Sequence, residues 1–198
     1  MAPDNEIPGG VGFAALLGRT EDAAAGLTQL EAFSAGFRFT LAVRLRRSPP
    51  EIAHGSLFAL TTGHGPHGVD VPPEHRLLLG VEYANGDRAS TLDDVWPPGV
   101  ETDDDDRRLF LSHAGDGGSD LTVDHSYWVT PLPPEGPVTF VLSWPGFGMP
   151  EARALVDGAL IRAAAERAVE LWPELPPAEP PEKPPPPRPS TGWFSYPD

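Results

Sequence analysis

The chain has 198 residues, a length typical of one domain with terminal extensions, and its hydrophobic content of 39% is sufficient for one core. With 29 acidic and 14 basic residues, its net charge of −15 would repel the phosphates of nucleic acids and of anionic membrane surfaces, so we expect neither as a partner. The absence of cysteine excludes disulfides, thiolate metal sites and cysteine nucleophiles.

No segment approaches the roughly 20 apolar residues of a membrane span, and the first ten residues lack the basic start and apolar stretch of a signal peptide. We therefore expect a cytoplasmic protein. Residues 1–10, with two prolines and two glycines, predict a flexible lead, and residues 11–172 predict the folded domain.

Apolar residues recur through 11–17 and 21–34, which predicts two or three antiparallel strands. The alternative is a helix over 20–30, capped by Thr20, and we favour the strands. The strongest pattern is residues 37–46, where large apolar side chains alternate with mostly polar ones. One face of this strand must therefore be covered by another sheet or a helix. Its members are Phe37, Phe39, Leu41, Val43 and Leu45.

Residues 57–60 predict a short strand, and 63–68 an irregular loop. Residues 76–84 predict a strand that continues into Asn85-Gly86, a strong signal for a type I′ hairpin turn. The polar residues 87–91 would return as an edge strand.

Residues 93–106 predict an acidic, solvated loop, and 108–112 a short strand followed by a glycine-rich loop over 114–119. Residues 121–129 alternate again, with His125 on the apolar face and Trp128 on the opposite one. Residues 137–144 alternate as well, but neither face is strongly polar, which predicts a central strand covered on both sides.

Residues 152–156 predict a last strand, and 160–172 a helix that ends before Pro173. Its apolar stripe would dock on the sheet. The stripe consists of Ile161, Ala164, Ala165, Ala168, Leu171 and Trp172. Residues 173–198 predict a disordered, proline-rich tail.

This pattern predicts a mainly β fold: a two-sheet antiparallel β-sandwich, immunoglobulin-like or jelly-roll-like, with one C-terminal α-helix. The segments 37–41, 79–83, 127–133 and 140–144, with Asp157-Gly158 and Leu171-Trp172, resemble those of uncharacterised β-sandwich-like proteins of high-GC bacteria. The resemblance covers residues 11–172. It implies no activity and assigns no site residue.

One loop contains the residue types of a metal site. His64, His67 and Asp70 supply two imidazoles and a carboxylate within seven residues, the ligands that zinc and similar ions take. They stand among glycines, with no helix or strand to fix their geometry, so an exposed loop is the favoured interpretation. His54, His75, His113 and His125 would join such a site only if the fold gathers them.

Other catalytic signals are missing from the sequence. The aspartates at 103–106 lack the spacing of an EF-hand loop, and neither a G-x-S-x-G elbow nor a phosphate-binding glycine loop occurs. We therefore predict no cofactor.

The tail suggests a partner. Lys183 and Arg188 flank four prolines in a pattern that polyproline-binding grooves recognise, and three aromatic residues, Trp193, Phe194 and Tyr196, follow near the end. Aromatic side chains provide much of the binding energy at protein interfaces. The sequence thus favours a non-enzymatic accessory or scaffold-binding module that docks onto a protein partner, and the alternative is a metal-dependent enzyme using the loop histidines. The oligomeric state stays open.

Overall fold

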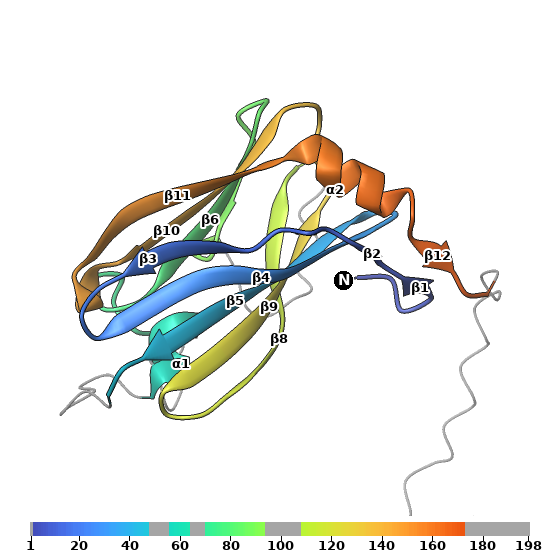
Figure 1. Ribbon diagram of the computed structural model, residues 1–198. Helices are drawn as coiled ribbons and strands as arrows, with labels where there is room; N and C mark the ends of the chain where they lie inside the picture. The colour runs from blue at the N-terminus through green and yellow to red at the C-terminus, as the bar shows by residue number, and fades with distance from the viewer. Residues whose placement is uncertain (1, 48–55, 64–69, 94–107, 173–198) are drawn as a thin grey trace, which may run out of the picture.

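The computed structural model describes residues 2–47, 56–63, 70–93 and 108–172. It is mainly β, with antiparallel strands and two short α-helices in the described residues (Figure 1). None of the helices in these ranges has the length and apolar character needed to cross a membrane.

The larger sheet has six strands in the order β2-β4-β5-β9-β8, and β3 also pairs with β4. The alternating segment expected at 37–46 is β5, at the middle of this sheet, and the segment 20–30 is strand rather than helix. The bounds are β2 (Gly9–Gly10), β3 (Ala15–Arg19), β4 (Ala23–Phe33), β5 (Gly36–Leu45), β8 (Phe110–Gly118) and β9 (Thr122–Thr130).

The second sheet has four strands in the order β11-β10-β6-β7. β10 is central and β7 lies at the edge, as their apolar and polar compositions predict. The bounds are β6 (Leu78–Tyr83), β7 (Arg88–Ser90), β10 (Pro137–Trp144) and β11 (Met149–Asp157).

The inner faces of the two sheets meet in an aromatic core, which we define as Phe37, Phe39 and Phe140. The Phe140 ring of β10 stands edge-on to the Phe39 ring of β5, with 5.0 Å between centroids, and also meets Phe37 at 6.4 Å. All three side chains are completely buried. The apolar face of β5 is therefore covered by the other sheet.

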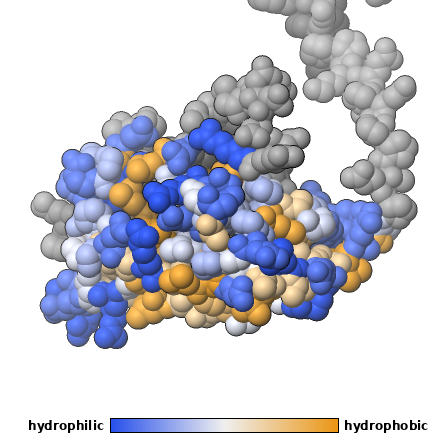
Figure 2. Space-filling view, turned by 90° about the horizontal axis from the view of Figure 1, so that it is seen from above, coloured by the Kyte–Doolittle hydropathy of each residue, from blue (hydrophilic) through white to orange (hydrophobic). Residues whose placement is uncertain are grey.

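The outer surface exposes some apolar side chains beside the edge strands. Leu16 of β3 and Leu155 of β11 are more than half exposed, and Figure 2 shows hydrophobic patches among hydrophilic side chains on the face seen from above.

Residues 57–60, expected as a strand, form the helix α1 (Leu57–Thr62), so that prediction is wrong. The Ser56 hydroxyl accepts from the Ala59 N–H at the start, and Gly63 ends the helix with a φ of 82°. A four-residue apolar run fits either element, and here the caps on both sides determine the helix.

The C-terminal helix is shorter than predicted. α2 (Gly158–Ala165) buries Ile161 and Ala164, but residues beyond it leave the sheet, and Trp172 is 65% exposed. The chain instead forms β12 (Val169–Glu170), which pairs with β1 (Glu6–Ile7). The predicted apolar stripe is thus buried at Ile161 and Ala164, whereas Leu171 and Trp172 are exposed.

Three smaller differences between the predicted and the observed elements concern backbone hydrogen bonds. The lead expected over 1–10 contributes β1 and β2, and the glycine-rich segment 114–119 continues β8 through Gly118 instead of forming a loop. At Asn85-Gly86 only Gly86 has a positive φ, and the Gly86 N–H donates to the Tyr83 carbonyl. This is the geometry of a type I turn followed by a glycine bulge, rather than of a type I′ turn.

Candidate metal centre

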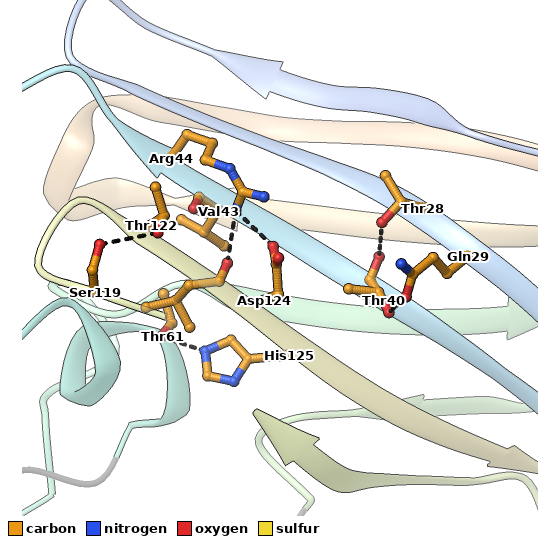
Figure 3. Close-up of polar contacts among 11 residues, drawn as sticks. Thr28, Gln29, Thr40, Val43, Arg44, Thr61, Ser119, Thr122, Asp124 and His125 are labelled. Atoms are coloured by element: carbon orange, nitrogen blue, oxygen red, sulfur yellow. Dashed lines mark hydrogen bonds and ion pairs between the residues drawn. The ribbon is translucent and has the colours of Figure 1, made fainter. Parts of the chain in front are cut away.

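Two polar side chains are buried among the described residues, and they touch each other. Thr61 of α1 is 1% exposed and His125 of β9 is 0% exposed. Their contact, Oγ1 to Nε2, is 2.6 Å long (Figure 3). Buried polar groups destabilise a fold unless they are hydrogen-bonded, and this contact gives each of the two side chains a partner.

Strand alternation places His125 on the inner face of the larger sheet. Val123 and Tyr127, two residues away on either side, are buried on the same face, while Asp124 is exposed on the other. On the outer face, Asp124 pairs with Arg44 at 2.6 Å (Figure 3). The aspartate next to His125 in sequence is therefore not beside its ring.

A β-bulge in β8 brings two further side chains to the inner face. His113 lies opposite Tyr127 and Asp116 lies opposite His125, and the register shifts between them at Ala114. In a regular strand, residues three apart point to opposite faces. Because the bulge inserts one residue, His113 and Asp116 point to the same face, toward His125.

Gly115 shows why this bulge has a glycine. Its φ of 155° is one that L side chains rarely adopt, although a Cβ at this position would touch nothing within 4 Å. The requirement is therefore conformational rather than steric.

His113, Asp116 and His125 together form what we call the histidine cluster. Each offers a ligand atom, and these atoms all lie within 4.8 Å of one another. His113 Nε2 is 3.3 Å from His125 Nδ1. Two nitrogens bound at about 2.0–2.1 Å to one tetrahedral ion would lie about 3.3 Å apart, so the pair already has the spacing of metal ligands. In the metal-free protein the same distance also fits a hydrogen bond between the rings.

Aromatic rings surround the cluster on the inner side. The Phe58 ring of α1 is 5.7 Å from the His125 ring, and Tyr127 lies 5.7 Å from the His113 ring in an edge-on arrangement. His113 and Asp116 are exposed, whereas His125 is buried. The cluster thus opens to solvent along the β8 edge.

The pKa of His125 is lowered from 6.5 to about 4, chiefly by burial and next by the neighbouring His113, while Asp116 and Asp124 act in the opposite direction. The ring is consequently neutral at neutral pH. A neutral imidazole has a free lone pair, which is the form that binds a metal ion.

The metal ligands expected from the sequence are mostly not those of the cluster. His64 and His67 lie outside the described residues, and Asp70 is described, exposed and not part of the cluster. Of the four histidines considered as additions, His113 and His125 come together. His75 is not in the cluster; its carbonyl accepts from Trp144 Nε1 at 3.1 Å.

Asp116 and Thr61 were not expected at any site. The sequence spacing of His113 and Asp116 does not fit a regular strand, and Thr61 directly follows the segment 57–60, which is expected as a strand. For this site, the alternation in residues 121–129 predicts one feature, the inward position of His125. The residues expected to bind a partner, Lys183, Arg188, Trp193, Phe194 and Tyr196, lie outside the described residues, as do the aspartates 103–106.

Comparison with protein-family models, with curated proteins and with solved structures gives no match to this chain. The resemblance to uncharacterised proteins of high-GC bacteria therefore stays a prediction.

Proposed function

We propose that the protein binds one divalent transition-metal ion at His113, Asp116 and His125. The observation behind this proposal is the convergence of two imidazoles and one carboxylate, with ligand atoms within 4.8 Å, at a place that only a strand bulge makes available. Two histidines and a carboxylate suit zinc, iron, cobalt or nickel better than magnesium or calcium, which prefer oxygen ligands.

Three protein ligands leave coordination positions for water or another molecule, and His113 and Asp116 are exposed. This is the ligand count of catalytic rather than closed structural sites. If the protein is a metal-dependent enzyme, the alternative expected from the sequence, we therefore propose the histidine cluster as its metal site instead of His64 and His67. The proposal itself is metal binding, without a named reaction.

Calorimetric titration of protein without an affinity tag, after treatment with a chelator, tests this function. We expect uptake of one Zn²⁺ or Co²⁺ per chain and much weaker binding of Mg²⁺ or Ca²⁺. At a free Zn²⁺ concentration of about 100 times Kd, the stability should rise by about 2.7 kcal/mol. For a domain of this size, that is an increase in Tm of about 5 to 10 °C.

Two variants separate the cluster from the loop. His113→Ala should abolish stoichiometric binding, whereas the double variant His64→Ala, His67→Ala should keep it. The reverse pattern would place the metal at the loop, and no uptake by the parent protein would end the proposal.

A protein-binding accessory role is the second candidate, and we propose that residues 173–198 dock to the partner together with the surface around β1 and β12. Ile7, Val169 and Trp172 are each more than half exposed there, directly before residue 173. Such apolar exposure on a small two-stranded ribbon supports docking to a protein partner in the cytoplasm, with the domain as a β-sandwich scaffold.

Deletion of residues 173–198 tests this role. We expect an unchanged unfolding transition and loss of binding to a partner that the full chain binds, and Trp193→Ala with Phe194→Ala should reproduce the loss alone. A markedly lower Tm of the shortened chain would instead indicate that these residues stabilise their own domain.

A further inference from the structure

The Thr61 hydroxyl has more neighbours than it can donate to. Its Oγ1 lies 2.6 Å from His125 Nε2, 2.9 Å from the Leu57 carbonyl and 3.0 Å from the Phe58 carbonyl. A hydroxyl has one proton and two lone pairs, and carbonyls only accept. Thr61 can therefore donate its single proton to only one of these three atoms.

One arrangement of protons satisfies both the contact of Thr61 with a carbonyl of its own helix and its contact with His125. If Thr61 donates to a carbonyl of its own helix, its oxygen is free to accept, and His125 Nε2 must supply the proton. The alternative, in which Thr61 donates to Nε2, leaves its contacts with the Leu57 and Phe58 carbonyls without a proton. A buried threonine on a helix commonly donates to the carbonyl four residues earlier, so the first arrangement is favoured.

The position of this proton determines which nitrogen of His125 faces the cluster. With Nε2 protonated, Nδ1 has the lone pair, and Nδ1 is the atom 3.3 Å from His113 Nε2. Metal-binding histidines usually donate their other N–H to a protein acceptor, which fixes both the tautomer and the ring orientation. Thr61 is placed to be that acceptor.

We propose that Thr61 is a positioning residue for the metal centre: its Oγ1 accepts a hydrogen bond from the Nε2–H of His125 and so holds Nδ1 toward His113 and Asp116. This inference rests on the proposed metal-binding function. The helix α1 fixes the position of the Thr61 hydroxyl, because both of its ends are capped and its Leu57 and Leu60 are buried.

Three variants test the role of the hydroxyl. Thr61→Val keeps the shape and removes the acceptor, and it should weaken Zn²⁺ binding by about 10- to 100-fold, the usual effect of losing such a partner. Thr61→Ser keeps the hydroxyl and should restore most of the affinity. The matched control is Thr62→Val, because the Thr62 hydroxyl donates to the Phe58 carbonyl from the same helix turn and should leave the affinity unchanged.

A spectroscopic measurement reports the tautomer without metal. The ¹⁵N shifts of the His125 ring in the metal-free parent should show the proton on Nε2, and Thr61→Val should shift them toward a mixture of tautomers. A merely structural role of Thr61 would lower the Tm of the valine variant and leave these shifts unchanged.

The outcomes separate the two claims. If the parent takes up no Zn²⁺, the proposed function fails and this inference fails with it. If the parent binds Zn²⁺ and the valine variant binds it equally well, or if the parent ring is protonated on Nδ1, the inference alone is overturned.

Discussion

Phe37 and Phe39 of the aromatic core lie on the same inner face of the larger sheet as the histidine cluster, but the two regions differ in chemistry. Phe37 and Phe39 are buried against Phe140 of the facing sheet, with edge-on rings that pack as apolar cores usually do. The cluster, on β8 and β9, contains a buried imidazole and two exposed polar side chains. Tyr127 links the regions, since its ring is stacked on Phe39 at 5.5 Å and also contacts His113.

This difference distinguishes residues whose burial stabilises the fold from a buried residue that stabilises it less well than an apolar one would. An apolar side chain in place of His125 would serve the core at least as well, because a buried imidazole requires partners and is costly to charge. The aromatic core therefore contributes to stability, and metal binding is the explanation that we propose for the histidine cluster.

The largest effect should come from the aromatic core. Phe39→Ala removes a completely buried ring with three aromatic neighbours, and we expect it to lower the free energy of unfolding by about 3 to 5 kcal/mol. The control is Phe110→Ala on β8, where the ring is 47% exposed and the change should stay within about 0.5 kcal/mol. Urea unfolding of both variants measures this, and equal losses would contradict the assignment of the core.

The next effect is acid destabilisation at the histidine cluster. Because the pKa of His125 is lowered from 6.5 to about 4 by burial and by His113, the unfolded chain binds its proton first as the pH falls. Stability should therefore be complete above pH 6.5 and decrease as the pH falls to about 4, with a total loss of about 3 kcal/mol.

Metal-free protein and the variant His125→Leu test this in parallel across that pH range. The variant has no ring to protonate, so its stability curve should be flatter than that of the parent between pH 6.5 and 4. Parallel curves would show that His125 is protonated as easily in the folded chain as in the unfolded one.

The sequence predicted the aromatic core better than the cluster, for a physical reason. Alternation of large apolar and polar residues in 37–46 and 137–144 reflects burial directly, and Phe39 and Phe140 are buried as expected. The same rule placed His125 on the inner face. Periodicity thus identifies which face a residue occupies wherever a strand is regular.

The rest of the site depends on features that periodicity does not encode. The bulge at Ala114 reverses the alternation of β8, so Asp116 reaches the inner face against the two-residue rule. Gly115 to Gly118 have low strand propensity and are strand only because β9 provides hydrogen-bond partners. The helix that carries Thr61 was not predicted because the short run 57–60 fits a helix and a strand equally well.

A glycine pair on β8 tests the bulge itself. Gly115→Ala forces a Cβ onto a backbone with a φ of 155°, and we expect it to lower stability by about 1 to 3 kcal/mol and to weaken Zn²⁺ binding. Gly117→Ala is the matched control, because this glycine also has open space around it but no such φ. Circular dichroism melts and calorimetry measure both effects, and indistinguishable variants would mean that the bulge does not need its glycine.

The smallest effect lies in the four-stranded sheet, at the opposite end of the pH scale. Tyr83 of β6 is buried, and its hydroxyl donates to the Pro131 carbonyl at 2.6 Å. Burial, and next the charge of Asp87, raise the pKa of Tyr83 above its ordinary value of 10.0. Above pH 10 the unfolded chain loses this proton while the folded chain keeps it, so stability should be unaffected below pH 10 and should fall as the pH rises beyond it.

Urea unfolding between pH 8 and 11, for the parent and for Tyr83→Phe, measures this alkaline loss. The phenylalanine variant should be less stable than the parent at pH 8 by about 1 kcal/mol, since it lacks the hydrogen bond, but its stability should fall less between pH 10 and 11. Lys183 is the only lysine, so few other side chains titrate near pH 10. An equally steep loss of stability in both proteins would assign the alkaline sensitivity to another group. A smaller loss in the variant would mean that each sheet contains a buried residue whose titration destabilises the fold, His125 in acid and Tyr83 in alkali.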